Sequence, residues 1–349
     1  MKISVILPYK ENFSSDYAGA VSLLLRDTVQ LSKYRSNIKI FGNTEFKRDL
    51  LKKNYINLPI NKSFFQSKSK VYLNQFEKYE INEPSQIIEI HNRPLYVKKI
   101  FNINENIVLF FHNDPLSMKG SISPKDRIRL LSITKKIIFI SKWVRDRFFL
   151  NIDIYKNKKL NYEIITHSID KTKINFNNKK NLIVFVGRLN LSKGYDIFGK
   201  AILKILNKHN NWNAIVYGDE PRENISFKHK NLKILGFKKN YEILDKLKTT
   251  SISVVCSRWE EPFGRTAMEA SSRGCAVIIS NRGGLPEAAS HPIKLKSFDH
   301  EALFKTIDKL IINKKYRTLI QKKTHDKFVL TNKLISRKLD DYRKKLIKS

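Results

Sequence analysis

The sequence predicts an α/β protein built from two doubly wound halves, and three patterns indicate this fold. Short apolar, β-branched runs alternate with longer amphipathic stretches, as strands alternate with helices in layered α/β proteins. The apolar runs are nearly continuous, which is typical of strands that are buried on both faces of a parallel sheet. A polar stretch without apolar periodicity, residues 170–181, separates the two halves.

Eleven apolar runs are candidate strands. Six of them precede the polar stretch, at 3–7, 38–41, 87–90, 107–111, 137–140 and 164–166. Five follow it, at 182–186, 214–217, 232–235, 252–256 and 276–280. Apolar residues at helical spacing predict helices over 16–34 and 241–248.

The polar stretch predicts a boundary between a first domain, 1–170, and a second, 171–349, and the length of the chain suits two domains. Near the end of the chain, apolar residues recur at helical spacing among Lys and Arg: Ile335, Leu339, Tyr342 and Leu346. We expect this helix, about 334–349, to pack on the protein itself, with a return to the first domain as one option. Contact with a membrane is the less favoured alternative.

The chain carries a formal net charge of +35, from 67 Lys and Arg against 32 Asp and Glu. Such a charge attracts any polyanion, but the basic residues are spread along the whole chain. Lys, Asn and Ile are abundant throughout, as AT-rich codon usage favours, so solvated surface lysines explain the charge equally well. A nucleic-acid-binding protein would need basic and aromatic residues on one surface, or a known module, and the sequence indicates neither.

Two cysteines, Cys256 and Cys275, exclude a disulfide scaffold and a cysteine-rich zinc module, and we interpret both as buried, inert thiols. No apolar run approaches the roughly 18 residues of a transmembrane helix. The first residues are too short an apolar stretch for a signal peptide. We therefore expect a cytoplasmic protein with reduced thiols.

Basic residues follow the expected strand at 182–186. Arg188 lies just after the strand end at Gly187, and Lys193 precedes Gly194, which is expected to open a helix. The carboxyl edge of an open α/β sheet is where ligands bind. A guanidinium and an ammonium beside a helix N-terminus can hold a phosphate or diphosphate, although surface cations beside a turn explain the pattern equally well.

Two carboxylates accompany the loop and helix after the strand at 252–256. Pro262 and Gly264 mark the loop, Glu261 lies in it, and Glu269 lies in the helix that follows. Two negative charges do not suit a phosphate alone, whereas they can accept hydrogen bonds from hydroxyl groups while backbone N–H groups hold a phosphate. A nucleotide sugar has this chemistry, with hydroxyls at both ends and a diphosphate between them. If each acid is considered alone, Glu269 is explained as a solvated helix residue and Glu261 as an ordinary acid of a loop.

The spacing from Glu261 to Glu269 resembles the E-x7-E signature of retaining glycosyltransferases of family 4, which have the GT-B fold. Further motifs occur in the order found in that family: Gly187-Arg188, Lys193-Gly194 and residues 280–287. The resemblance is close over 185–287. It implies two Rossmann-like domains facing a cleft, with the acceptor bound by 1–170 and the nucleotide sugar by 171–349.

The resemblance also implies roles for single residues. Glu261 would hold the hydroxyls of the donor sugar, and Glu269 the ribose diol. Arg188 and Lys193 would neutralise the diphosphate as it leaves. Backbone amides near the sugar and diphosphate would come from Phe263, Gly264 and Arg265. The base pocket would be lined by Leu235, Gly236 and Phe237.

Fewer motifs mark the first domain. Ala18-Gly19 lies where the family usually has two adjacent glycines, and Gly19 would let the backbone approach the donor phosphate. His112 ends a strand and resembles the family histidine that reaches the sugar and phosphate. His91 ends the preceding strand, where contact with the acceptor or sugar competes with a structural role. We interpret His167 as structural or hinge-like.

The resemblance implies transfer of a hexose-type unit from a nucleoside diphosphate sugar to a glycan or lipid-linked acceptor, in cell-envelope polysaccharide or lipopolysaccharide synthesis. It implies no cofactor and no metal, and no D-x-D motif occurs. We also expect peripheral contact with anionic lipid at the inner face of the cell membrane. We expect no specific nucleic-acid partner. Another GT-B sugar-nucleotide enzyme, an epimerase or phosphorylase, is the alternative, and a basic nucleic-acid-binding protein is less favoured. A dinucleotide dehydrogenase would need G-x-G-x-x-G after the first strand, which is absent.

Overall fold

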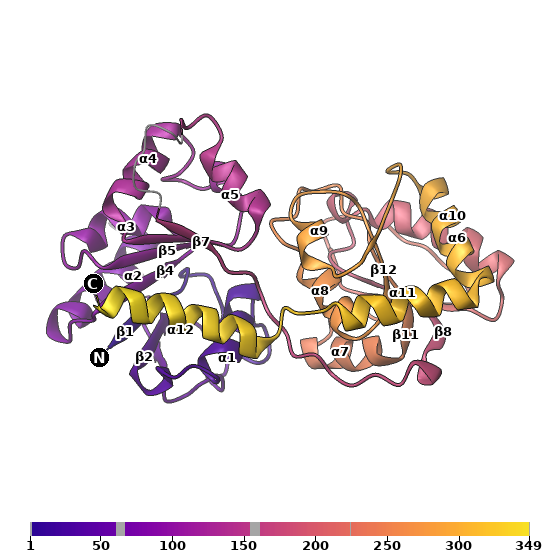
Figure 1. The fold of residues 1–349 in the computed structure, drawn as a ribbon, viewed down its shortest axis with the longest axis horizontal. Coiled ribbons are helices and arrows are strands. Elements are labelled where there is room, and N and C mark those ends of the chain that lie inside the picture. Colours follow the sequence, from indigo (N-terminus) through magenta and orange to yellow (C-terminus); the bar gives the residue numbers. More distant parts are fainter. Residues whose placement is uncertain (1, 61–66, 154–160, 224, 349) are drawn as a thin grey trace. The chain divides into compact units, whose positions relative to one another are not determined.

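The computed structural model describes residues 2–60, 67–153, 161–223 and 225–348, which form two compact units (Figure 1). The first unit consists of Met1–Ser168 together with Asn332–Ser349, and the second is Ile169–Thr331. The division after Ser168 lies close to the boundary expected after residue 170. The last helix belongs to the first unit although it follows the second in sequence.

The first unit is built on a seven-stranded parallel sheet with the order β3-β2-β1-β4-β5-β6-β7. Its strands are β1 (Ile3–Ile6), β2 (Ile38–Gly42), β3 (Tyr55–Asn57), β4 (Ile87–His91), β5 (Ile107–Phe111), β6 (Lys136–Phe139) and β7 (Tyr162–Ile164). Its helices are α1 (Ala20–Val29), α2 (Lys68–Asn82), α3 (Pro94–Phe101), α4 (Pro124–Ile133), α5 (Lys142–Phe149) and α12 (Asn332–Lys348). The strand order reverses direction between β1 and β4, so the loops after these strands diverge and leave room for a ligand.

The second unit is built on a six-stranded parallel sheet with the order β10-β9-β8-β11-β12-β13. Its strands are β8 (Lys180–Val186), β9 (Asn213–Tyr217), β10 (Leu232–Ile234), β11 (Thr250–Val255), β12 (Ala276–Ile279) and β13 (Ile293–Lys294). Its helices are α6 (Tyr195–Lys208), α7 (Asn240–Thr249), α8 (Arg265–Ser272), α9 (Leu285–Ala288), α10 (His300–Ile312) and α11 (Lys314–Asp326). The reversal of strand order lies between β8 and β11, the two strands whose loops carry the predicted motifs.

The two parallel sheets confirm the predicted fold class, and each of the eleven expected strands has a counterpart. The sequence did not indicate β3 and β13, which have three and two residues and therefore lack a readable apolar run. The helix expected over 16–34 is wrong at both ends, because α1 begins after Gly19 and ends at Val29. Asp16 and Tyr17 form bends instead, and Gly19 caps the helix.

The last helix, α12, packs on α1 and β4 of the first unit (Figure 1). Its apolar residues Ile335, Leu339 and Tyr342 are buried in the core that β1, β2 and α1 also form. The apolar face is therefore taken up by the protein, as the favoured interpretation of the sequence expected. An exposed basic face remains, which carries Lys333, Arg337, Lys338, Lys344 and Lys345.

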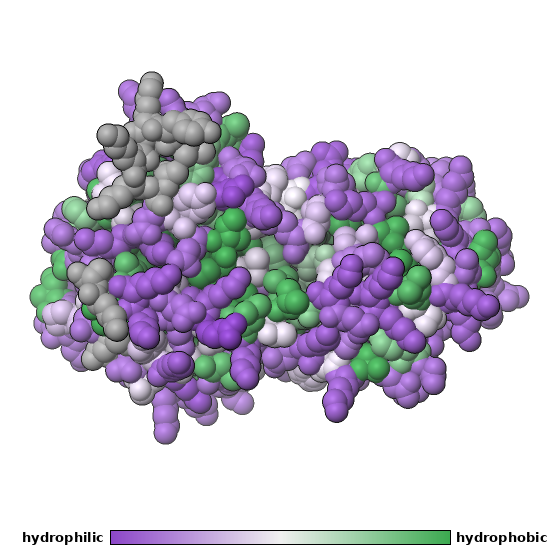
Figure 2. Space-filling model, viewed as in Figure 1, coloured by the Kyte–Doolittle hydropathy of each residue, from purple (hydrophilic) through white to green (hydrophobic). Residues whose placement is uncertain are grey.

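Charged and polar side chains cover most of the face shown in Figure 2, and hydrophobic residues lie between them in small groups. Within the described ranges, every helix is too short or too polar to cross a membrane.

Candidate active site

Two loops of the second unit meet beside β8 and β11, where the strand order reverses. Gly194 lies in the loop after β8 and caps α6 with a φ of +70°. A Cβ atom at this position would overlap the carbonyl oxygen of Cys256, directly after β11. Both the left-handed backbone and the lack of space require glycine here. The two loops therefore touch through their main chains.

Hydrogen bonds connect these two loops and fix their relative positions. The carbonyl oxygen of Ser192 accepts hydrogen bonds from the backbone N–H groups of Arg258 (2.9 Å) and Trp259 (3.0 Å). The Arg258 guanidinium donates to both carboxylate oxygens of Asp196, at 2.5 and 2.7 Å. Burial by itself would raise the pKa of Asp196, but the hydrogen bonds and charge of Arg258, together with backbone N–H groups at the start of α6, outweigh burial and lower this pKa. The loops thus form one fixed platform.

This platform brings together two residues that the sequence analysis assigned to the ligand. The Lys193 ammonium forms an ion pair with Oε1 of Glu261, and the two side chains are 24% and 14% exposed. The expected roles place Lys193 at the diphosphate and Glu261 at the sugar hydroxyls. In a nucleotide sugar the phosphate and the sugar ring are directly bonded, so neighbouring side chains can serve both.

The motif at 280–287 packs against the loop that carries Glu261. Gly283 has a φ of +57°, and a Cβ atom there would overlap the Glu261 backbone. Gly284 donates its N–H to the carbonyl oxygen of Glu261 at 2.6 Å. Glu260 accepts from the Gly283 N–H at 2.5 Å and from Arg282 at 3.0 Å. The sequence showed this motif only as a family resemblance, and its adjacent glycines were the signal for this close backbone approach.

The N-terminus of α8 follows the Glu261 loop. Gly264 caps the helix with a φ of +106°, and within the described chain the N–H groups of Gly264 and Arg265 have no acceptor. The preceding residue, Phe263, is buried. Glu269 is only 5% exposed, and its Oε1 accepts hydrogen bonds from Asn240 (3.1 Å) and from Arg265 (3.3 Å). Sequence reasoning missed Asn240, because its contact with Glu269 depends on how α7 packs on α8. It assigned only the backbone of Arg265, although the i,i+4 spacing from Arg265 to Glu269 within α8 could have indicated the side-chain contact.

Three other predicted positions, Arg188, Gly236 and Phe237, lie at neighbouring strand ends. Arg188 follows β8, is exposed, and has no ion-pair partner among the described residues. Gly218 follows β9 and donates its N–H to the carbonyl oxygen of Gly236, after β10, at 2.8 Å. Phe237 is exposed beside Gly236. These residues share the carboxyl edge of the sheet with Lys193.

A cavity of about 830 Å³ opens on the second unit beside α7, lined in part by Tyr217, Leu235, Tyr241 and Arg273. Leu235 belongs to the predicted base pocket, whereas Gly236 and Phe237 do not line this cavity.

In the first unit, the surroundings of Gly19 differ from the expectation. Gly19 caps α1, but a Cβ atom there would overlap the carboxylate of Glu11. Oε1 of Glu11 accepts a hydrogen bond from the backbone N–H of Ser22 in the first turn of α1, at 3.0 Å. Burial raises the pKa of Glu11, although this hydrogen bond acts in the opposite direction. In this structure a carboxylate of the protein itself therefore lies at the helix N-terminus where a phosphate was expected.

The two strand-end histidines are buried and in contact. His91 Nδ1 and His112 Nε2 lie 2.9 Å apart, and the residues are 1% and 5% exposed. The His91 ring stacks on Phe110 at 4.2 Å, and the His167 ring lies 5.3 Å from His112. Burial lowers the pKa of His91 to about 3 and places the pKa of His112 well below its usual value. Both imidazoles are therefore neutral at pH 7, and the structure does not present His112 as an open surface group.

Lowering the pH from 6.5 to 4.5 is expected to destabilise the protein through this histidine pair. The unfolded chain protonates His91 near pH 6.5, whereas the folded chain does so only near pH 3, so the unfolded state binds more protons in this interval. Stability then falls by up to about 1.4 kcal/mol per pH unit for each such histidine. Urea unfolding of wild type, His91→Gln and His112→Gln at pH 7.5, 6 and 4.5 should show a flatter dependence in both variants. An unchanged slope in both would contradict the assignment.

Among the described residues, no group of three or more His, Cys, Asp or Glu side chains could hold a metal ion.

Comparison with known proteins gives matches over both units. Residues 167–327 match the family model "Glycosyl transferases group 1". An uncharacterized glycosyltransferase of Methanocaldococcus jannaschii is 29% identical over 180 residues, which are 49% of this chain and 40% of that protein. The putative glycosyltransferase YtcC of Bacillus subtilis is 24% identical over 84% of this chain and 78% of its own length. The matched region spans less than half the length of the first two relatives.

Solved structures resemble almost the whole chain. Anabaena HepE in complex with UDP-glucose has a TM-score of 0.75 at 14% identity, covering 99% of this chain and all of HepE. A glycosyltransferase of Rickettsia africae has a TM-score of 0.73 at 19% identity, covering 100% and 99%. WaaG, a glycosyltransferase involved in lipopolysaccharide biosynthesis, has a TM-score of 0.65 at 12% identity, covering 97% and 99%. At these identities the likeness establishes the GT-B fold.

Proposed function

Because the chain belongs to the glycosyl transferases of group 1, we propose that it transfers a hexose from a nucleoside diphosphate sugar to an acceptor hydroxyl with retention of the anomeric configuration. The observation that carries the proposal is the Lys193–Glu261 pair beside the N-terminus of α8. It offers a cation, a carboxylate and free backbone N–H groups at one point of the sheet edge.

Each of these groups fits one part of a nucleotide sugar. Glu261 accepts hydrogen bonds from hydroxyls of the sugar, and Lys193, with Arg188, faces the diphosphate. The N–H groups at the start of α8 hold a phosphate oxygen. Glu269 accepts hydrogen bonds from the ribose diol, oriented by Asn240 and Arg265.

In the proposed reaction, the bond between the anomeric carbon and the phosphate oxygen breaks as the acceptor oxygen bonds to that carbon on the same face. The acceptor proton passes to an oxygen of the departing phosphate. Negative charge therefore grows on the nucleoside diphosphate, where Arg188, Lys193 and the α8 N–H groups stabilise it. A separate general base is not required, and Glu261 serves to position the sugar.

We propose a glycan or lipid-linked acceptor in cell-envelope synthesis. One relative is the lipopolysaccharide core biosynthesis mannosyltransferase LpcC of Rhizobium leguminosarum, 29% identical over 31% of this chain and 33% of its own length. The net charge of +35 and the exposed basic face of α12 support peripheral contact with the anionic inner face of a membrane. Vesicle sedimentation that is independent of anionic lipid would contradict that contact.

Donor binding is the direct test. Thermal unfolding in EDTA is measured with a panel of uracil and guanine nucleotide sugars and with the free nucleotides. A donor at a hundred times its Kd should stabilise wild type by about 2.7 kcal/mol. Glu269→Gln replaces an ionised acceptor of the ribose hydroxyls by a neutral amide, so we expect a clearly smaller shift.

Glu301→Gln is the matched control, because Glu301 is an exposed acid on α10 that pairs with Lys204. It should keep the full shift with the donor. A wild-type protein that no nucleotide sugar or nucleotide stabilises would overturn the proposal, above all if RNA or DNA stabilised it instead.

A further inference from the structure

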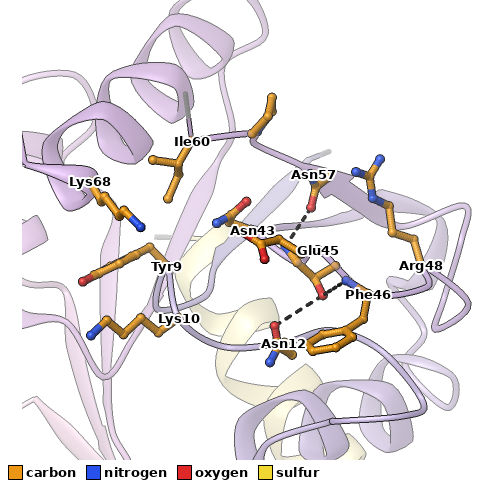
Figure 3. A pocket seen from close by; sticks show the side chains of 12 residues that line it. Tyr9, Lys10, Asn12, Asn43, Glu45, Phe46, Arg48, Asn57, Ile60 and Lys68 are labelled. Carbon is orange, nitrogen blue, oxygen red and sulfur yellow. Dashed lines mark hydrogen bonds between the residues drawn. The ribbon is translucent and has the colours of Figure 1, made fainter. Parts of the chain in front are cut away.

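The first unit contains a cavity of about 480 Å³ at the carboxyl ends of three neighbouring strands (Figure 3). Tyr9, Lys10 and Asn12 follow β1, Arg48 belongs to the loop after β2, and Asn57 ends β3. Lys68, the first residue of α2, completes this set. The volume lies in the range of small-molecule pockets, roughly 300–1,000 Å³. We refer to it as the β1–β3 pocket.

Positive charge dominates the lining of the β1–β3 pocket. Lys10, Arg48 and Lys68 are exposed, and none of them has an ion-pair partner within the described chain. Among the described lining residues, Glu45 is the one carboxylate. In Figure 3, Lys10 and Lys68 lie on one side of Asn43 and Arg48 on the other. Cations that face one cavity from different elements attract an anion more strongly than scattered lysines do.

The amide side chains of the pocket act as hydrogen-bond donors. Oδ1 of Asn57 accepts from the Thr44 N–H (2.9 Å) and from the Tyr55 hydroxyl (3.0 Å). Oδ1 of Asn12 accepts from the Thr44 hydroxyl at 3.4 Å. Because the protein occupies these oxygens, the amide nitrogens are the groups left for a ligand. Donors from amides and cations together suit a ligand rich in unprotonated oxygen.

Aromatic and amide groups add features that suit a sugar ring. The rings of Tyr9 and Phe46 line the same cavity, and Phe46 also packs against Tyr17 with ring centroids 4.5 Å apart. Aromatic faces contact the apolar face of a sugar ring, while amide groups bind its hydroxyls. The lining of the cavity therefore suits a ligand that has a sugar ring as well as a negative charge.

We propose that the β1–β3 pocket binds an acidic sugar unit, whose ring carries a carboxylate or a phosphate. That this unit is the acceptor rests on the proposed function. The enzyme would then extend an acidic glycan, and Arg48, Lys10 and Lys68 would select it over a neutral one by charge.

The test uses the full chain without nucleotide and measures Kd by ligand-observed NMR at fixed low salt. The probes are methyl glucuronide, glucose 6-phosphate, the neutral methyl glucoside and inorganic phosphate. We expect at least tenfold tighter binding of the acidic sugars than of the neutral one. The two acidic probes separate a carboxylate from a phosphate preference. Inorganic phosphate that binds as tightly as glucose 6-phosphate would overturn the sugar part of the proposal.

Arg48→Gln and Lys68→Gln should each weaken binding of the acidic probes at least fivefold. Lys47→Gln is the matched control, because Lys47 is an exposed neighbour of Arg48 that does not line the pocket. Equal effects of Arg48→Gln and Lys47→Gln, or equal affinity for acidic and neutral sugars, would overturn the proposal.

These probes contain no nucleotide and the variants lie in the first unit, whereas the donor test concerns Glu269 in the second. Binding of the acidic sugar and binding of the donor can therefore each fail while the other stands, and only the assignment of the acidic sugar as acceptor falls with the proposed function.

Discussion

Replacing Lys193 by methionine is expected to lower kcat about a hundredfold to a thousandfold, as loss of one preorganised charge partner does in other enzymes. Methionine keeps most of the side-chain length and removes the cation that meets the growing charge on the departing diphosphate. It also leaves the carboxylate of Glu261 without its ion-pair partner. The rate is measured as release of nucleoside diphosphate from whichever donor stabilises the wild type.

Lys204→Met is the matched control for this variant. Lys204 lies on α6 and also forms a Lys–Glu ion pair, with Glu301, but both side chains are about half exposed on the surface. A solvent-exposed ion pair contributes little to stability, so kcat and stability should both stay near wild type. Lys193→Arg should retain more activity than Lys193→Met, because it keeps the charge. If Lys193→Met behaved like Lys204→Met, Lys193 would have no part in catalysis.

The fold could be predicted to the level of strands and their parallel arrangement, because buried strands leave continuous apolar runs. What escaped prediction lacks such a run. β3 is three residues long and half-buried at the edge of its sheet, and β13 has only two residues. The helix at 16–34 was overestimated because α1 begins only after its cap at Gly19 and ends at Val29, where the chain enters a turn.

The candidate site could be predicted where its residues are close in sequence. Glu261 and Glu269 follow one strand, and their spacing was readable. The contact of Lys193 with Glu261 joins residues 68 positions apart, and the contact of Asn240 with Glu269 joins residues 29 apart. Such contacts depend on strand order and helix docking, which no local pattern encodes.

Burial was the other property that the sequence left undetermined. A histidine at a strand end can face solvent or the interior, because side chains alternate along a strand. His91 and His112 both turn inward and meet one another. Gly19 was interpreted as space for a phosphate, and in this structure the carboxylate of Glu11, from the same β1–α1 loop, lies there. For the histidines and for Gly19, the sequence indicated the residue itself, but it could not indicate which side chain lies against it.

Replacing Arg343 by methionine is expected to lower the free energy of unfolding by about 3–5 kcal/mol, the usual cost of breaking a buried ion pair. Arg343 on α12 donates to both carboxylate oxygens of Glu89 on β4, at 2.7 and 2.9 Å, and the side chains are 1% and 0% exposed. Burial alone would lower the pKa of Arg343, but Glu89 outweighs it and raises this pKa. Thermal unfolding should show a Tm lower by about 6–20 °C, since each kcal/mol shifts Tm by about 2–4 °C in a domain of this size.

The double variant Glu89→Leu/Arg343→Met distinguishes a lost pair from a charge left alone. If the cost of Arg343→Met comes from the uncompensated Glu89 carboxylate, removing that carboxylate as well should recover most of the stability, because apolar replacements of buried pairs are often neutral. Arg337→Met, on the exposed face of the same helix, should change stability by no more than about 0.5 kcal/mol. Additive losses in the double variant would instead mean that each side chain stabilises the fold separately, Glu89 through Tyr342 and Arg343 through Asp340.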